Sequence, residues 1–426
     1  MSGMTCAFSY HYVCVRCATP QPWDGIRYRC HVCGQNLRVE RKADSHSPAA
    51  ADLVRAFRGR GMWRYAALLP VDDRWRSRLD VGGTPLVDCG AERSAHLWIK
   101  DEARNPSGSL KDRATELVLA VARRSGCKRV VTASTGNAGA SLACIAASHA
   151  MRATVLVPAS APPAKLAQIR AYGATVRLVE GGYDAAFDIA ERMADDARVC
   201  CRNTGVNPFT REGKKTCAFE IAESLDWQVP DWVIVPTGDG NLLSGIATGF
   251  FDLFSLGITS SVPRLLAAQA ERSNSIARDW RAHGRHRDID LPDAPVAVHP
   301  DSVADSLCVE RPRDHFAALS ALRATRGDCV VISDAQIMTA SRALAQRFGL
   351  WFEPSSAAGY AALRDCLASG LIAPGARVVV LGTGSGLKSV QASEHAPLDG
   401  ASDILDVGPH HAQDNRRLAG KADTRP

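Results

Sequence analysis

The sequence lacks any apolar stretch long enough to cross a membrane. No uninterrupted apolar run approaches the roughly 18 residues that a spanning helix requires. Residues 1–12 also lack the charged segment and apolar core that mark a secretory leader. We therefore expect a cytoplasmic protein without a membrane partner.

A strong excess of one charge is missing as well. The chain of 426 residues carries 51 basic and 45 acidic side chains, a formal net charge of +6, and the two kinds are interspersed. Because nucleic-acid binding usually needs an extended basic face, we expect no nucleic-acid partner. The chain also has no P-loop and no complete G-x-G-x-x-G, so its motifs do not favour nucleotide binding. It has no repeat of solenoid period either, so a repeat architecture is not expected.

We also expect no disulfides, although the chain has fourteen cysteines. A disulfide framework is not expected in a long chain without a secretory leader. Cysteines such as Cys144, Cys217 and Cys366 stand alone within apolar segments, where a thiol behaves as a small buried hydrophobe. These positions therefore indicate core packing.

Four N-terminal cysteines form a different pattern. Cys14-x-x-Cys17 and Cys30-x-x-Cys33 are two knuckles separated by twelve residues, a spacing typical of a closed tetrahedral zinc ribbon. Residues 8–41 are too few to form an apolar core of their own, so the metal could supply folding free energy. A redox dithiol pair and unligated cysteines are the alternatives. Four thiolates leave no open coordination position, so we expect structural and not catalytic zinc.

Beyond the ribbon, predicted strands and helices alternate, which favours two α/β modules with mostly parallel sheets. Short apolar segments predict strands at residues 97–100, 130–133, 154–157, 175–179, 232–235, 265–269 and 377–381. Apolar residues at helical spacing predict helices at residues 112–125, 138–150, 164–172, 183–197, 243–256, 334–348 and 356–369.

The motif NPSGSLKDR at residues 105–113 places Lys111 at the start of a predicted helix. The first turn of a helix carries partial positive charge, which should lower the pKa of the lysine amine. Imine formation with an aldehyde cofactor requires such a neutral amine. The alternative is a solvated surface lysine, against which the rigid turn of small residues argues. We therefore predict that Lys111 carries the chemistry.

Three glycine-rich turns follow predicted strands. They are STGNAG at residues 134–139, TGDGN at residues 237–241 and GTGSG at residues 382–386. The first two open helices, whose free N–H groups and dipole favour an anion. Ligands in open α/β folds bind at the carboxyl ends of strands, so these turns are candidate ligand sites. A purely conformational need for glycine is the alternative for each of them.

Together, the lysine motif and the three turns resemble fold-type II pyridoxal-phosphate enzymes, the tryptophan synthase beta-like superfamily, in order and spacing. The chain is most similar to the threonine synthases. Further matches are residues 63–65, 69–70, 82–86, 207–213, 215–216 and 353–358. The resemblance covers residues 62–390 and implies pyridoxal 5'-phosphate as the cofactor.

The resemblance implies a role for each matching residue. Lys111 would bind the cofactor aldehyde covalently and then move protons between substrate carbons. Asn137 would meet the ring hydroxyl, and Thr383 would meet the pyridine nitrogen. The cofactor phosphate would lie against Thr237, Gly238, Asp239, Gly240 and Asn241.

For a threonine synthase the substrate is O-phosphohomoserine, which loses phosphate from its γ carbon and gains water at its β carbon. Ser134 and Thr135 would hold the substrate carboxylate. A second anion pocket is needed for the substrate phosphate, and its candidates are Ser107, Ser109, Lys165 and Asn207.

Four positions depart from the family pattern. The family usually has arginine directly after Asn-Pro-x, where this chain has Thr210 followed by Arg211. Lys214 replaces the usual glutamine, and Asp239 replaces the usual asparagine. A carboxylate close to a phosphate is unfavourable unless it points away or meets a cation, and the simpler interpretation is that Asp239 faces outward. These departures bear on the substrate more than on the fold or cofactor.

Three functions therefore compete. Threonine synthase is the leading hypothesis. A relative with another substrate is the second: a cysteate synthase-like β-replacement enzyme on phosphoserine, a specialised-metabolism enzyme, or a threonine/serine dehydratase. A zinc-ribbon binding protein with an inactive enzyme core is the third. The retained Lys111 and the lack of an aromatic and basic stripe on the ribbon argue against it.

The predicted domains follow from these observations. We expect the zinc ribbon at residues 1–42, a linker at 43–61, the catalytic core at 62–393 and a disordered tail at 394–426. A smaller domain, near residues 125–225, is expected to be inserted in the larger one. The resemblance also implies a homodimer and a small amino-acid phosphate as the bound molecule.

Overall fold

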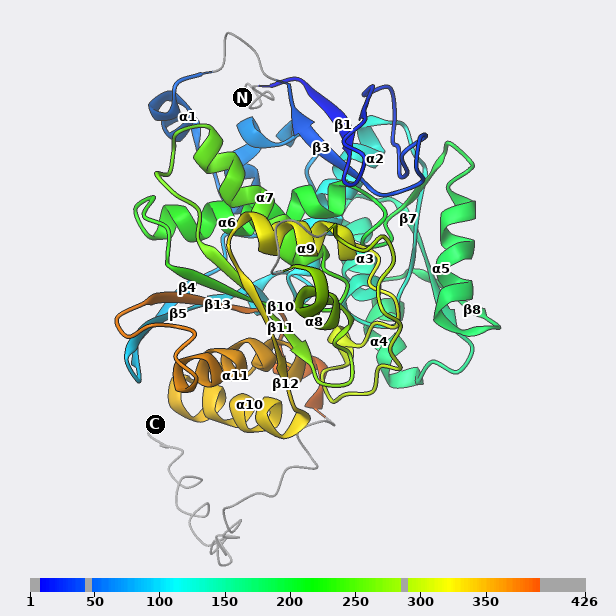
Figure 1. Ribbon diagram of the computed structural model, residues 1–426. Helices are drawn as coiled ribbons and strands as arrows, with labels where there is room; N and C mark the ends of the chain where they lie inside the picture. The colour runs from blue at the N-terminus through cyan, green and yellow to red at the C-terminus, as the bar shows by residue number, and fades with distance from the viewer. Residues whose placement is uncertain (1–7, 43–47, 285–289, 391–426) are drawn as a thin grey trace, which may run out of the picture. The chain divides into compact units, whose positions relative to one another are not determined.

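The computed structural model describes residues 8–42, 48–284 and 290–390. The tail predicted at residues 394–426 and the first part of the predicted linker lie outside them. Figure 1 shows the arrangement of the strands and helices.

The N-terminal ribbon is an antiparallel sheet of β1 (Tyr10–Cys14) between β2 (Pro20–Gln21) and β3 (Leu37–Arg41). Tyr12 stacks on Trp23 with ring centroids 4.9 Å apart, and both rings lie edge-on against Phe209 of helix α6 (Phe209–Ser224). The ribbon therefore shares apolar contacts with the core. Metal ligation, the source proposed from sequence, would not be its only source of folding free energy.

The larger sheet has six strands, and all but one of its strand pairs are parallel. From one edge to the other, the order is β12 (Asp328–Ile332), β11 (Arg264–Ala270), β10 (Trp232–Pro236), β13 (Arg377–Gly382), β5 (Ala95–Asp101) and β4 (Leu86–Glu92). Edge strand β4 alone runs antiparallel to its neighbour. The glycine-rich turns at residues 237–241 and 382–386 lie at the carboxyl ends of β10 and β13, as the sequence predicts.

The smaller sheet is wholly parallel and lies within the range predicted for the smaller domain. Its strand order is β8 (Thr175–Val179), β7 (Arg152–Pro158), β6 (Arg129–Ala133) and β9 (Val199–Cys201). The fold prediction of two mostly parallel α/β units behind a small cysteine ribbon is confirmed. The domain boundaries themselves stay a prediction.

Helices cover both faces of the larger sheet. The α-helices of the described residues are α1 (Ala50–Ala56), α2 (Lys111–Arg124), α3 (Asn137–Ser148), α4 (Pro163–Ala171), α5 (Gly182–Met193), α6, α7 (Asn241–Ser255), α8 (Ser275–Asp279), α9 (His315–Ala324), α10 (Asp334–Phe348) and α11 (Pro354–Ala368). Helices α10 and α11 lie on one side of the sheet, and α6, α7 and α9 lie on the other (Figure 1).

The β10 strand shows why both faces are covered. Successive side chains of a strand point to opposite faces. Val233 and Val235 therefore enter the cluster formed with α6 and α7, whereas Trp232 and Ile234 enter the cluster formed with α10 and α11. A strand that is apolar at every position, as this one is, must be buried on both sides.

Every strand and helix predicted from sequence is present, with ends shifted by a few residues. The sequence prediction missed strands β4, β9 and β12 and helices α6, α8 and α9, of which α6 is the longest. Charged side chains lie inside this helix and are almost fully buried, which removes the apolar periodicity that predicts a helix. They are Arg211, Glu212, Lys214 and Lys215.

A cluster of paired charges lies between α2, α6 and β5, and we call it the paired cluster. Arg113 donates from Nε to Glu102 (2.7 Å) and from Nη2 to Glu220 (2.6 Å). Lys100 adds a third contact, from Nζ to Glu220 (2.7 Å). All four side chains are buried, so each charge depends on its partners for compensation.

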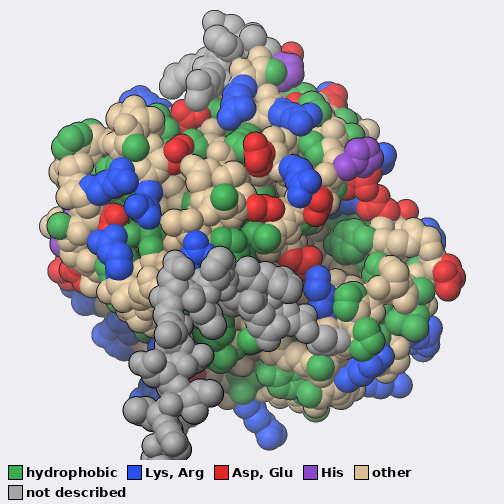
Figure 2. Space-filling model, turned by 90° about the horizontal axis from the view of Figure 1, so that it is seen from below, with side chains coloured by type: hydrophobic (Ala, Val, Ile, Leu, Met, Phe, Trp, Pro, Cys, Tyr) green, Lys and Arg blue, Asp and Glu red, His purple; other side chains and the backbone are tan. Residues whose placement is uncertain are grey.

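The surface agrees with the charge pattern of the sequence. On the face shown in Figure 2, basic and acidic side chains are interspersed, without a broad basic patch among the described residues. No helix within residues 8–42, 48–284 and 290–390 is long and apolar enough to cross a membrane.

Candidate active site

Lys111 is the first residue of α2. The loop before it is held by Asp112, whose carboxylate accepts hydrogen bonds from the backbone N–H and the hydroxyl of Ser107, both at 2.6 Å. The Leu110 N–H donates to the carbonyl of Thr383 at 2.9 Å. The lysine loop is thus joined to the glycine turn that follows β13.

The pKa of Lys111 is lowered, mainly because burial removes water from the amine. The Arg202 guanidinium lowers it further, whereas the carboxylates of Asp239 and Glu353 raise it. The direction predicted from sequence is therefore confirmed, but its cause differs from the helix N-terminus that we first considered. Residues distant in sequence set the reactivity of this amine.

The candidate phosphate turn, residues 237–241, joins β10 to α7. Gly240 has a left-handed backbone (φ +87°), and a Cβ there would lie 2.6 Å from the Cβ of Ala318. Only glycine fits this position. Asn241 begins α7, so the turn ends at backbone N–H groups without partners within the helix, a natural site for an anion.

Asp239 faces this site. It is half-buried, and its Oδ1 accepts the Asn241 N–H at 3.0 Å. Its negative charge raises the pKa values of Lys111, Arg202 and Lys214, so it lies among three cations. The expectation that Asp239 faces outward is wrong, because these cations offset the cost of placing a carboxylate here.

Lys214 is a second buried lysine of the site. Its Nζ donates to Oδ1 of Asn241 at 2.6 Å, directly below the start of α7. Burial lowers its pKa well below the usual lysine value, and the neighbouring Lys111 lowers it further. Sequence comparison marked this residue as a departure from the family, but not as part of the phosphate turn.

Arg202 was missed by the sequence analysis. Its buried guanidinium donates to the hydroxyls of Thr115 (3.0 Å) and Thr204 (2.5 Å) and to the carbonyl of Lys111 (3.5 Å). None of these acceptors is a carboxylate, and burial lowers the Arg202 pKa to about 10. The residue follows the short strand β9, which the sequence analysis did not predict, so no motif pointed to it.

Two further pairs complete the site. Nδ2 of Asn137 donates to both carboxylate oxygens of Glu353, at 3.1 and 2.9 Å. The hydroxyls of Thr383 and Ser356 lie 2.9 Å apart. Glu353 and Ser356 belong to a motif that carried the resemblance, so the sequence held their signal although we assigned them no role.

The candidates for the substrate phosphate separate into two groups. The hydroxyl of Ser107 is bound to Asp112, the amide of Asn207 is bound to the backbone of Cys201 and Phe209, and the exposed Lys165 pairs with Asp305 at 2.9 Å. By contrast, the Ser109 hydroxyl is buried and has no hydrogen-bond partner among the described residues.

The candidates for the substrate carboxylate lie in the turn before α3. Ser134 and Thr135 are half-buried there, and Oγ of Ser134 accepts the Gly136 N–H at 3.2 Å. All six substrate assignments stay predictions.

Two of the four departures from the family pattern are engaged away from Lys111. The Thr210 hydroxyl donates to the carbonyl of Asn207 at 2.7 Å, and Arg211 donates to Asp314 at 2.6 and 2.7 Å. Lys214 and Asp239 therefore remain as the departures that face the reacting centre.

The four cysteines of the ribbon converge as their spacing predicts. Their sulfur atoms all lie within 4.8 Å of one another, with 3.4 Å between Cys14 and Cys33 and 3.7 Å between Cys17 and Cys30. Tetrahedral zinc with bonds of about 2.3 Å separates its sulfurs by about 3.8 Å. The donor set therefore fits a closed zinc site.

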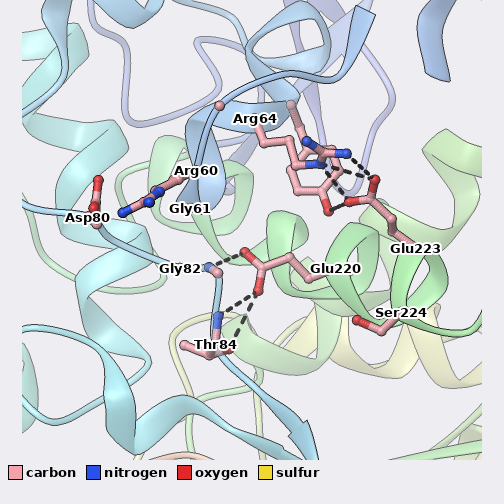
Figure 3. A pocket seen from close by; sticks show the side chains of 12 residues that line it. Arg60, Gly61, Arg64, Asp80, Gly82, Thr84, Glu220, Glu223 and Ser224 are labelled. Atoms are coloured by element: carbon pink, nitrogen blue, oxygen red, sulfur yellow. Dashed lines mark hydrogen bonds and ion pairs between the residues drawn. The ribbon is translucent and has the colours of Figure 1, made fainter. Parts of the chain in front are cut away.

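A cavity of about 410 Å³ lies beside the paired cluster, and it is a different place from the Lys111 site. Figure 3 shows Glu220 there, bonded to the N–H group of Thr84, with Glu223 also lining the cavity. The Gly83 N–H also donates to Glu220, at 2.8 Å. None of the residues lining the cavity belongs to the three glycine turns.

Comparison with known proteins agrees with this geometry. Residues 77–384 match the model of the family described as "Pyridoxal-phosphate dependent enzyme". The chain belongs to this family. The match begins before the lysine loop and includes residues 237–241 and Thr383, so one family pattern covers all the candidate cofactor residues.

Curated relatives of this pyridoxal-phosphate-dependent enzyme include threonine synthases. That of Methanocaldococcus jannaschii is 35% identical over 389 residues, which is 90% of this chain and 94% of the relative. That of Methanosarcina acetivorans is 33% identical over 388 residues, 90% of this chain and 93% of the relative. The resemblance predicted from sequence is confirmed.

Solved structures show the same fold at lower identity. The processed form of threonine deaminase isoform 2 from Solanum lycopersicum aligns with a TM-score of 0.60 and 21% identity, covering 74% of this chain and 88% of that one. Maize serine racemase aligns with a TM-score of 0.59 and 23% identity, covering 73% and 91%. This pyridoxal-phosphate-dependent enzyme is therefore of fold-type II.

Proposed function

We propose that this enzyme converts O-phosphohomoserine and water to threonine and phosphate. The observation that supports this most is the similarity to curated threonine synthases over 90% of the chain. The site adds physical support, because it combines a lysine of lowered pKa with buried cations that suit a doubly anionic substrate and cofactor.

The residues present fit pyridoxal phosphate. The phosphate turn ends at the helix N-terminus of α7, and Lys214 lies below it with no bonded carboxylate. Asn137 is the first residue of α3, and Thr383 follows β13 and accepts the N–H of Leu110, the residue before Lys111. When bound, pyridoxal phosphate supplies an aldehyde and an electron-withdrawing ring that stabilises negative charge on a substrate carbon.

The residues of the chain then act around that group. Lys111 would supply the neutral amine that holds the cofactor, and its Nζ would then move protons at the substrate carbons. Asn137, whose Nδ2 is bonded to Glu353 in the described chain, would meet the ring hydroxyl. Thr383, which pairs with Ser356, would present a hydroxyl and no carboxylate to the pyridine nitrogen, and this would keep the nitrogen unprotonated and moderate the stabilisation of negative charge.

The substrate needs two anion sites of its own. We assign its carboxylate to Ser134 and Thr135, in the turn before α3. For its phosphate, the buried Ser109 hydroxyl remains without a partner in the described chain, and Arg202 lies beside Lys111 without a bonded carboxylate. Both are better placed than the exposed Lys165, which is paired with Asp305.

The decisive experiment supplies O-phosphohomoserine, O-phosphoserine and threonine separately to the purified enzyme. We expect equal amounts of phosphate and threonine from O-phosphohomoserine. Phosphate from O-phosphoserine alone would instead indicate a β-replacement enzyme, and 2-oxo acid from threonine alone would indicate a dehydratase. Lys111→Ala is the control, since it should release nothing from any of the three.

We also propose a structural zinc bound by Cys14, Cys17, Cys30 and Cys33. Metal analysis of freshly purified protein should give about one zinc per chain, and a metal-free protein would contradict the assignment. A cytoplasmic homodimer, with residues 125–225 as the smaller catalytic domain, completes the proposal.

A further inference from the structure

One buried amide of the ribbon contacts the core beside the phosphate turn. Asn36 lies just after the second cysteine knuckle and is 3% exposed. Its Nδ2 donates to the carbonyl of Arg313 at 2.6 Å and to Oδ1 of Asp314 at 3.3 Å. A side chain of the ribbon therefore helps to fix a carboxylate of the core.

Asp314 is the residue that holds the phosphate turn. Its carboxylate accepts Nδ2 of Asn241 at 2.9 Å and the hydroxyl of Ser244 at 2.8 Å, both in the first turn of α7. Its backbone N–H donates to the carbonyl of Asp239 at 3.0 Å. One residue thus fixes both the turn and the helix start that we assign to the cofactor phosphate.

The negative charge of Asp314 is compensated by the groups around it. Burial alone would raise its pKa, but the Arg211 guanidinium and the hydrogen bonds from Ser244 and Asn241 hold the pKa below its usual value. Arg211 also donates to the carbonyl of Leu37 on the ribbon, at 3.4 Å. The ribbon therefore contacts both members of the ion pair.

Asn36 is itself held firmly within the ribbon. Its Oδ1 accepts Nη1 of Arg29 at 2.8 Å, and its carbonyl accepts the N–H of Val15 at 3.0 Å, next to the first knuckle. On the core side, a Cβ at Gly240 would lie 3.0 Å from the carbonyl oxygen of Asp314. Close-packed neighbours transmit displacement, so the turn cannot keep its position if Asp314 moves.

We propose that Asn36 is a positioning residue for the cofactor phosphate, and that the ribbon and the phosphate turn form one coupled unit. The inference rests on the proposed function only in taking residues 237–241 as the phosphate site; it is independent of the substrate. Coupling is reciprocal: if the intact ribbon favours cofactor binding, the bound cofactor must stabilise the ribbon.

The first test compares two ribbon variants of the full chain. Asn36→Ala removes the amide contact with Asp314, whereas the control Tyr12→Phe removes a 2.8 Å hydrogen bond to Gly25 that lies wholly inside the ribbon. Absorbance titration of the cofactor-free enzyme with pyridoxal phosphate should show a dissociation constant raised about tenfold in Asn36→Ala and unchanged in Tyr12→Phe.

Metal content and thermal unfolding of each variant show whether it is folded. If the two folded variants bind the cofactor equally well, the proposal is overturned. The phosphorus NMR signal of the bound cofactor is a second readout, and we expect it to shift in Asn36→Ala only. Failure of the parent enzyme to bind pyridoxal phosphate would instead contradict the proposed function.

The second test uses reciprocity. The release of ribbon metal to a colorimetric chelator is timed with and without bound pyridoxal phosphate. The cofactor should slow release several-fold in the parent and in Tyr12→Phe, but not in Asn36→Ala. Equal slowing in all three proteins, or no slowing in the parent, would contradict the coupling.

Discussion

Two clusters of charge both include residues of α2 and α6, and they are compensated differently. In the paired cluster, Arg113 and Lys100 are bonded to two carboxylates at 2.6 to 2.7 Å. In the site cluster, which we define as Lys111, Arg202, Lys214 and Asp239, three cations surround one carboxylate and none of the three is hydrogen-bonded to it in the described chain.

The pKa directions reflect this difference. Burial would lower the pKa of Arg113, but Glu102 and Glu220 raise it well above its usual value. Burial does lower the pKa values of Lys111, Arg202 and Lys214, because too few negative charges lie near them. A cluster in which each cation is paired with a carboxylate serves the fold, whereas a cluster with excess positive charge is suited to bind anionic ligands.

The largest effect is expected where the paired cluster is broken. Arg113→Met leaves Glu102 and Glu220 buried without their main cation, which should lower the free energy of unfolding by about 3–5 kcal/mol. Urea denaturation measures this. Arg64→Met is the matched control, since Arg64 forms a more exposed pair with Glu223 and its loss should cost about 1 kcal/mol or less. Equal losses would refute the distinction.

Next in size is the loss of the reactive amine from the site cluster. Lys111→Ala should lower the turnover by about 10³-fold or more and remove the visible absorption band of the bound cofactor. The free energy of unfolding of the cofactor-free protein should not fall, because the variant removes a poorly compensated cation. An unchanged absorption band would remove Lys111 from its assigned role.

A smaller effect is expected from the cation below the phosphate turn. Lys214→Gln should raise the dissociation constant of pyridoxal phosphate about tenfold without destabilising the cofactor-free protein. Its neighbour Lys215 is paired with Glu212 and Asp252, at 2.6 and 2.8 Å. Lys215→Gln should show the opposite pattern, a loss of stability with little change in cofactor affinity. Titration and urea denaturation together distinguish the two lysines.

The smallest effect concerns pH. The rate at which the cofactor-free enzyme takes up pyridoxal phosphate should rise with pH as Lys111 loses its proton, with a midpoint below the usual lysine pKa. Because the Asp239 carboxylate raises the pKa of Lys111, Asp239→Asn should move this profile to lower pH. Stopped-flow absorbance follows the rate, and a shift to higher pH would reverse our electrostatic description.

Local sequence predicted much of the fold and the principal site residue. Strands such as β10 are apolar at every position, and glycine turns follow them, so the alternation was visible. Lys111 was found because its loop has a distinctive composition. These are features that a short segment carries by itself.

The parts that were missed depend on tertiary contacts. Helix α6 was not predicted because its buried positions hold Arg211, Lys214 and Lys215, whose partners come from other helices and from the ribbon. Arg202 carries no motif, and its importance comes from lying beside the Lys111 carbonyl. Asp239 was placed outward because its three cationic neighbours are far away in sequence.

The hydrogen bond from Leu110 to Thr383 also has a consequence for biosynthesis of the protein. The lysine loop leaves the ribosome early, but the turn that holds it follows β13, the last strand of the larger sheet. Nascent chains released before residue 383 should therefore contain Lys111 and yet fail to develop the visible band of bound cofactor. Capture of the cofactor becomes a late event, reserved for chains whose core is complete.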